Sequence, residues 1–189
     1  MIIMYTEYDQ ETTVLAGYAR QFNSEVASKV SNILGPPDTA DARHAEATLT
    51  TNPAPFFFFG HGIKSGLIAQ DHATIDFNKD PHLLSGRLVC ATCCESETVL
   101  EGAARNHGAT GIGYSGKVWL FLSPPYSELM EKCLLAGPRA LAEGESAREA
   151  GRRAGSECER LAQELIKGPI EDQVYAPFLQ MNANRIRVF

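Results

Sequence analysis

The sequence predicts an α/β fold, a three-layer αβα sandwich built around a mainly parallel central sheet. Short apolar stretches of strand length alternate along the chain with longer stretches in which apolar residues recur at helical spacing. Four consecutive phenylalanines, at positions 56–59, are typical of a strand buried on both faces, as the central strands of parallel sheets are. This alternation of strands and helices indicates an α/β sandwich, with reactive groups expected where the parallel strands end.

In the first third of the chain, residues 2–8 are rich in β-branched and aromatic residues and predict the first strand. Leu15, Phe22 and Ile33 then belong to an apolar stripe that predicts a helix, which we expect to end at Gly35 and the two prolines after it. Residues 38–50 are ambiguous and include an alanine-rich stretch that is compatible with a short helix. The phenylalanine strand follows.

The later elements are predicted from similar signals. Residues 66–77 predict a β-hairpin, and residues 88–92 and 111–114 predict two further core strands. A T-x-x-E pattern at Thr98 and Glu101 predicts a helix start. After residue 119 we expect a loop and a helix, then a second helix capped by Ser146 and Glu149, and a short final strand over residues 185–189.

Length and composition limit the functions that fit this chain. With 189 residues, of which 44% are hydrophobic, we expect one domain over residues 1–189 with a sizeable core. The net charge of −6 argues against a nucleic-acid or membrane-surface binder, because either needs a basic face. No apolar stretch has the length of a membrane span, and the first residues lack the features of a signal peptide. We therefore expect a cytoplasmic protein.

The cysteines are odd in number, and three of the five lie within five residues, which does not suit a disulfide framework. A catalytic or metal-binding role suits that cluster better than a disulfide role. Cys90, Cys133 and Cys158 fall on apolar faces and are expected to be core residues. Cys90 and Cys93 have C-x-x-C spacing, but no second such pair and no nearby histidine pair accompanies them, so a zinc site is not favoured.

Two reactive side chains follow two of the predicted core strands. His61 stands between two glycines directly after residues 56–59, and Cys93 and Cys94 come directly after residues 88–92. Because parallel strands end at the same edge of a sheet, we expect His61 to lie near a cysteine there. An imidazole can remove the proton of a thiol, and the N-terminus of a following helix can stabilise the thiolate. The N–H groups of Gly62 and Cys94 are then candidates for an oxyanion hole.

The order of these motifs resembles the CHAT domains of the caspase-like clan of cysteine peptidases. The family pattern is an apolar strand ending in Gly-His-Gly, an apolar strand ending in a small residue and Cys, a helix, Gly-Ala, and an apolar strand leading to a Trp. The matching residues are Gly60-His61-Gly62, Cys93-Cys94-Glu95-Ser96, Gly108-Ala109 and Trp119. The resemblance covers roughly residues 55–155.

The resemblance implies a caspase-like fold and a cysteine endopeptidase that cleaves a protein or peptide substrate without metal or organic cofactor. His61 would be the general base and Cys94 the nucleophile, although Cys93 occupies the place of the family's small residue and leaves open which thiol attacks. Family members resemble regulated effectors of prokaryotic immune or cell-death pathways, including antiviral defence, so a regulatory protein partner is a hypothesis. The candidates for the substrate pocket are Glu95, Ser115, Gly116 and Trp119.

Two other functions are compatible with the same residues. A catalytically idle domain of the same fold could bind a partner through the cleft, because a motif gives residue types and not geometry. A thiol redox protein could use Cys90 and Cys93, although residues three apart around a strand end face opposite sides of the sheet.

Overall fold

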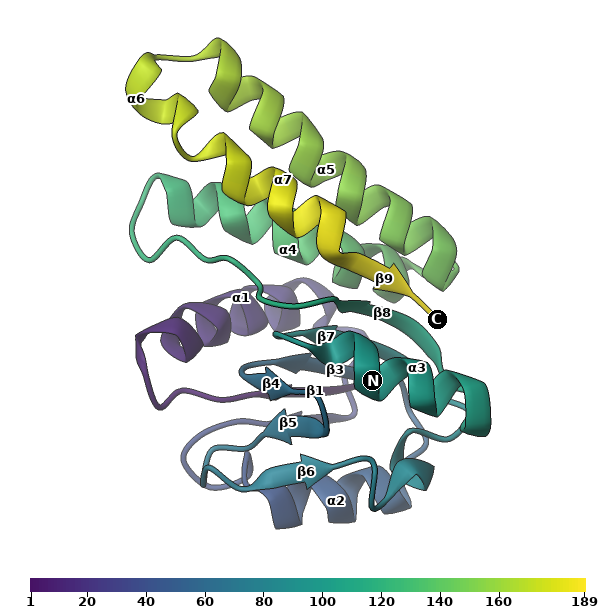
Figure 1. The fold of residues 1–189 in the computed structure, drawn as a ribbon. Coiled ribbons are helices and arrows are strands. Elements are labelled where there is room, and N and C mark those ends of the chain that lie inside the picture. The colour runs from purple at the N-terminus through teal and green to yellow at the C-terminus, as the bar shows by residue number, and fades with distance from the viewer.

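The computed structural model describes residues 1–189 and has an α/β architecture with a six-stranded, mainly parallel sheet (Figure 1). The first five strands run parallel to their neighbours, and only the last strand is antiparallel. Across the sheet the strands are β2 (Asn32–Leu34), β1 (Ile2–Tyr5), β3 (Phe56–Phe59), β7 (Leu88–Thr92), β8 (Thr110–Tyr114) and β9 (Ile186–Val188). The α/β class and the parallel sheet predicted from the sequence are thereby confirmed.

Helices cover both faces of this sheet, and each face has its own apolar core. On one face lie α1 (Gln10–Val26), α4 (Tyr126–Glu143), α5 (Ala147–Lys167) and α7 (Ala176–Arg185), with the short α6 (Ile170–Gln173) between the last two. On the other face lie α2 (Ala42–Thr51) and α3 (Ser96–His107). Figure 1 shows α4, α5 and α7 stacked on one side of the sheet and α2 on the other. No helix is both long and apolar enough to cross a membrane.

Strand β3 explains why the sequence needs four consecutive phenylalanines. Phe56 and Phe58 belong to the core on the α2 and α3 face, and Phe57 and Phe59 to the core on the α1 face. All four side chains are at most 1% exposed. Because the two faces of a strand alternate, a run without polar residues fits only a strand that is covered on both sides.

A small antiparallel sheet follows β3 and packs on the α2 face. Its strands are β4 (Gly62–Ile63), β5 (Gly66–Ile68) and β6 (Thr74–Asp76), with β5 in the middle. The pairing of β5 with β6 confirms the predicted hairpin. The structure also gives the ambiguous stretch before β3 a helix, α2, which Asp41 caps by accepting a hydrogen bond from the His44 N–H at 2.9 Å.

The prediction of one long helix up to Gly35 is wrong. Helix α1 ends at Val26, a 3₁₀ turn follows over Ala27–Lys29, and residues 32–34 form the edge strand β2. Ile33 pairs with Ile3 of β1 and is 47% exposed. The three- to four-residue spacing of Val26, Val30 and Ile33 imitates a helical stripe, but β-branched residues also favour a strand.

Two helix starts were predicted from capping patterns, with different outcomes. The pattern at Thr98 and Glu101 is not a cap, because α3 begins earlier, at Ser96. The helix is instead preceded by Glu95, which has a left-handed backbone (φ 56°). At α5 the prediction is confirmed, since the Ser146 hydroxyl accepts a hydrogen bond from the Glu149 N–H at 3.3 Å. The final strand is also confirmed, as β9.

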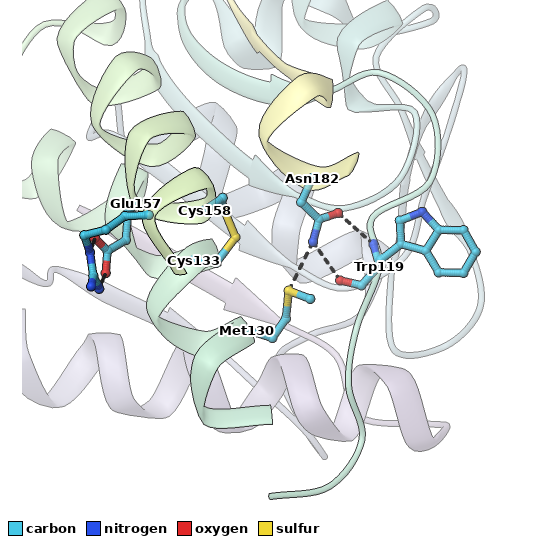
Figure 2. Close-up of a disulfide and its surroundings, with 7 residues drawn as sticks. Trp119, Met130, Cys133, Glu157, Cys158 and Asn182 are labelled. Atoms are coloured by element: carbon cyan, nitrogen blue, oxygen red, sulfur yellow. Dashed lines mark hydrogen bonds and ion pairs between the residues drawn. A yellow bond between two sulfur atoms is a disulfide. The ribbon is translucent and has the colours of Figure 1, made fainter. Parts of the chain in front are cut away.

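Cys133 and Cys158 are buried as predicted, but they are also joined in a disulfide, which the sequence interpretation did not include (Figure 2). The bond links α4 to α5, with 4.7 Å between the two Cα atoms. Helical periodicity places each cysteine on a buried face. It does not show that the two faces are packed against one another at the same height, and this packing is what brings the sulfurs together.

Candidate active site

His61 and Cys94 occupy equivalent places at the ends of two neighbouring parallel strands. Strand β3 pairs with β7 in the register Phe59 to Thr92, so each of the two reactive residues lies two positions beyond this pair. Both side chains line one cavity of about 570 Å³. The structure therefore brings the predicted base and the predicted nucleophile to one site.

His61 is held by a carboxylate that the sequence interpretation missed. Its Nε2 atom lies 2.7 Å from Oδ2 of Asp9, in the loop between β1 and α1. Because β1 is the neighbour of β3 in the sheet, the residues after these two strands meet at the same edge. The Tyr8 ring packs beside the imidazole, with 5.7 Å between centroids.

Asp9 is fixed in turn by the first turn of α1, which it caps. Its Oδ1 atom accepts hydrogen bonds from the Thr12 N–H at 2.8 Å and from the Thr12 hydroxyl at 2.7 Å. Partial burial opposes the charge, but the bonds from Thr12 and His61 outweigh burial and lower the pKa of the Asp9 carboxyl below its usual range. An ionised Asp9 accepts a hydrogen bond from the Nε2–H of His61, so in the neutral imidazole Nδ1 is the nitrogen that can act as a base.

The two adjacent thiols differ in exposure. Cys93 is only 1% exposed, and burial raises the pKa of its thiol. Cys94 is half-buried, has a free thiol and contributes to the cavity wall. The Val118 N–H donates a hydrogen bond to the Cys94 sulfur at 3.3 Å, which orients it. No hydrogen bond joins the Cys94 sulfur to His61; the imidazole is bonded to Asp9 through Nε2, and the sulfur to the Val118 N–H.

The backbone after Cys94 turns sharply into α3. The Glu95 N–H donates to the Gly116 carbonyl at 2.8 Å, and the buried Ser96 hydroxyl accepts a bond from the Tyr114 N–H at 2.8 Å. These bonds tie the turn to β8 and to the loop after it. Cys94 consequently lies directly before the N-terminal end of α3, where the helix dipole favours negative charge.

Gly62 packs directly against the cysteine segment. A Cβ atom at this position would lie 2.4 Å from the Cys94 carbonyl oxygen and 2.6 Å from the Cys93 sulfur, so no larger residue fits. The His61 carbonyl accepts from the Ile68 N–H at 3.0 Å, which makes Gly62 and Leu67 a non-hydrogen-bonded pair of the β4–β5 ladder. The Gly62 N–H is thus directed away from β5, and the Cys94 N–H likewise donates to no protein acceptor.

The remaining wall of the cavity is mostly apolar. Leu15 of α1 contributes a buried side chain, and the loop after β8 contributes Val118, Trp119, Leu120 and Leu122. Two exposed side chains of opposite charge, Glu11 and Lys117, also border it.

Of the residues that the sequence suggested for the substrate pocket, Trp119 lines the cavity. Glu95, Ser115 and Gly116 are not part of its lining; Glu95 and Gly116 bond to each other, and the Ser115 N–H donates to the Arg185 carbonyl at 2.8 Å. Trp119 itself is clamped by Asn182 of α7. Figure 2 shows the two hydrogen bonds, each 2.9 Å long, between the Asn182 amide and the Trp119 main chain.

Cys90 and Cys93 are placed on opposite sides of the central sheet. Cys90 belongs to the core on the α1 face and Cys93 to the core on the α3 face, and both thiols are free. Burial raises the pKa of Cys90 to about 12. No three histidine, cysteine or acidic side chains converge in a way that could hold a metal ion.

Comparison with known proteins identifies no relative of this chain among protein families or curated proteins. No family model matches the chain, and no curated protein is significantly similar to it.

Proposed function

We propose that this chain is a cysteine endopeptidase with a caspase-like fold, in which His61 and Cys94 form the catalytic pair. The observation that carries the proposal is their placement at the ends of adjacent parallel strands, in the wall of one cavity. The bond from Asp9 to Nε2 of His61 supports a base at Nδ1, and the exposure of Cys94 favours this thiol over the buried Cys93.

The chemistry uses these groups in order. His61 takes the proton of the Cys94 thiol, and the thiolate attacks the carbonyl carbon of the peptide bond, forming a C–S bond and placing negative charge on the oxygen. The free N–H groups of Gly62 and Cys94 are the proposed donors to that oxygen. When the C–N bond breaks, His61 returns the proton to the leaving amine. Water then attacks the thioester and releases the carboxylic acid and the free thiol.

Turnover of a peptide library by purified protein tests this function. We expect cleavage products from the unmodified chain and from the Cys93→Ala variant, but not from Cys94→Ala or His61→Ala. Mass spectrometry of the products identifies the cleaved bonds. If Cys94→Ala still cleaves as fast as the unmodified chain, Cys94 is not the nucleophile.

A second function is favoured by one specific observation. No hydrogen bond joins the Cys94 sulfur to His61, whose Nε2 is bonded to Asp9, while Cys94 accepts from Val118. A catalytically idle domain that binds a partner through the same cavity is consistent with this arrangement, although catalytic contacts commonly tighten only when substrate binds. Binding of peptides without turnover, unchanged in Cys94→Ala, would identify such a domain.

The same resemblance to the caspase-like clan underlies a proposal about context. We place the peptidase among regulated effectors of prokaryotic immune or cell-death pathways, with a protein that controls its activity. Comparing library cleavage by the purified chain alone and in extract of its own cells tests this point. A regulated enzyme gains activity in the extract, and an unregulated one does not.

A further inference from the structure

We propose that the cavity beside Cys94 selects an apolar side chain on the residue whose carbonyl group the thiol attacks. This proposal rests on the proposed peptidase function and adds the class of substrate to it.

The inner surface of the cavity offers contacts to hydrocarbon. Leu15, on the sheet-facing side of α1, is 3% exposed, and Cys93 is 1% exposed with a thiol that burial keeps neutral. Val118 and Leu120 add half-buried aliphatic side chains from the loop after β8. Removing an aliphatic or aromatic substrate side chain from water against these groups is favourable by roughly 1.5–3 kcal/mol.

The charged groups that line the cavity offer no buried and unengaged partner to a charged substrate side chain. Asp9 uses one carboxylate oxygen for Thr12 and the other for His61. Glu11 and Lys117 have opposite charges and are both exposed, so they favour neither sign of charge inside. A substrate aspartate or arginine would therefore lose its hydration without a buried counter-charge, which is unfavourable.

Because the cavity adjoins the Cys94 sulfur, we expect it to hold the side chain of the residue whose carbonyl group is attacked. Cys94 and His61 are both part of its wall, and the side chain of an acyl group bonded to the Cys94 sulfur begins one carbon away from the reacting carbonyl. A cavity of about 570 Å³ exceeds the volume of any single side chain. Selection is accordingly made by polarity rather than by size.

Three matched peptidyl acyloxymethyl ketones test this selection, identical except for leucine, aspartate or arginine next to the reactive group. The Cys94 thiolate forms a C–S bond and displaces the carboxylate leaving group, so the rate of adduct formation reports on how well each side chain is accepted. We expect the leucine probe to label Cys94 at least about tenfold faster than either charged probe. An aspartate or arginine probe that reacts as fast overturns the proposed selection while the peptidase function stands.

Failure of the peptidase function itself gives a different result. In that case no probe labels Cys94 faster in the unmodified chain than in His61→Ala. A second probe set, varied only at the next residue out, completes the test. A strong apolar preference at that residue, with none at the first, assigns the cavity to another part of the substrate and also overturns the proposal.

A charge placed in the cavity wall provides a gain-of-function test. Leu122 is 39% exposed, so Leu122→Glu leaves the core intact, and we expect it to raise the arginine-to-leucine rate ratio by about two- to fivefold. Ile170→Glu is the matched control, since Ile170 is 79% exposed on α6 and outside the cavity. A ratio that changes equally in both variants, or in neither, contradicts the proposal.

Discussion

Three side chains form the candidate site, and each is held in place by a different local interaction. Asp9 is fixed because it caps α1, His61 because it bonds Asp9, and Cys94 because the Val118 N–H contacts its sulfur. None of these interactions depends on a flexible side chain reaching across open space. Each group therefore has a fixed partner before substrate binds, whereas the contact between His61 and Cys94 itself is still to be made.

Replacing Asp9 by asparagine tests the role assigned to this carboxylate. Asparagine caps a helix as well as aspartate, so we expect the free energy of unfolding to change by less than about 1 kcal/mol. Its amide group would face Nε2 of His61 with N–H donors and would favour the wrong tautomer. We therefore expect labelling of Cys94 by the leucine probe to slow by at least roughly tenfold.

The chain offers a matched control for this substitution. Asp41 caps α2 and also contacts a histidine, since its Oδ2 atom lies 2.5 Å from Nδ1 of His44. Neither of these two residues belongs to the cavity lining. Asp41→Asn should leave the labelling rate unchanged. Equal slowing in both variants would show that Asp9 acts only through folding.

Arg87 is the residue on which we expect folding to depend most strongly. It is 5% exposed, and its guanidinium donates to the carbonyls of Leu83 at 2.6 Å, Asn52 at 2.6 Å, Ala54 at 2.7 Å and Leu49. Arg87→Ala leaves these acceptors without a donor, and we expect it to lower the free energy of unfolding by about 3 kcal/mol or more. Urea denaturation measures this change, and Arg87→Lys should lower the free energy of unfolding by less than Arg87→Ala does. If Arg87→Ala lowers it by less than about 1 kcal/mol, the role given to Arg87 is contradicted.

The sequence could predict His61 and Cys94, but not Asp9, for a physical reason. Each of the first two follows directly on a strongly apolar strand, and that signal is local. The approach of Asp9 to His61 depends on β1 lying beside β3, with β2 on the outer side, and the order of strands along the chain does not reveal this arrangement. An acidic residue after the first strand, followed by Thr12 at the capping position, was the available signal.

At the scale of elements, two side-chain amides hold the loops that complete the site. The Gln70 amide pairs with the main chain of Glu7, accepting from its N–H at 2.7 Å and donating to its carbonyl at 3.2 Å, in the loop that carries Asp9. Asn182 pairs in the same way with Trp119, in the loop that carries Val118. Each side-chain amide thus makes the pair of hydrogen bonds that a neighbouring strand would make to an extended segment of a sheet.

Removal of the Asn182 clamp should affect the cavity more than the rest of the fold. Asn182 is fully buried, and Asn182→Ala removes both hydrogen bonds to Trp119, so we expect a loss of about 2 kcal/mol in unfolding free energy. Trp119 is the only tryptophan, and its fluorescence should shift to longer wavelength as the loop opens to water. Labelling of Cys94 by the leucine probe should slow by about fivefold or more.

Asn184→Ala on the same helix is the control, because Asn184 has no contact with Trp119 among its hydrogen bonds. It should alter neither the fluorescence nor the labelling rate. If Asn182→Ala is destabilised but keeps the emission and labelling of the unmodified chain, Asn182 is structural and does not position the cavity wall.

Local pattern predicted the buried strands and the hairpin, but it missed the edge strand β2 for a physical reason. The buried strands β3, β7 and β8 and the hairpin were predicted because they are apolar runs bounded by turn residues. The edge strand β2 was missed because it is short and half-exposed, so that its side chains carry no strong pattern. Its identity comes from pairing with β1, which is a tertiary contact.

At the scale of the whole molecule, α4 and α5 form the outer layer beside the sheet and are joined by the disulfide (Figures 1 and 2). The bond closes a loop of 25 residues between two buried positions. Such a link restricts the unfolded chain and stabilises the folded one by roughly 3 kcal/mol. Met130 lies one turn before Cys133 and accepts a hydrogen bond from Asn182, so this layer also supports the cavity wall.

Counting thiols in the denatured protein tests the disulfide. Without reductant we expect alkylation of three cysteines, Cys90, Cys93 and Cys94, and with reductant all five. In the Cys133→Ala, Cys158→Ala double variant we expect the free energy of unfolding to be about 3 kcal/mol lower than in the oxidised protein. Alkylation of five cysteines without reductant would show that the two buried sulfurs are not bonded.

The central claim is that His61 activates Cys94, and the site of a covalent peptide adduct tests it most directly. The protein is incubated with the leucine acyloxymethyl ketone, digested, and mapped by mass spectrometry, in parallel with His61→Ala. We predict one adduct, on Cys94, that forms in the unmodified chain and is lost in the variant. An adduct on Cys93, or equal labelling of Cys94 with and without His61, would contradict the claim.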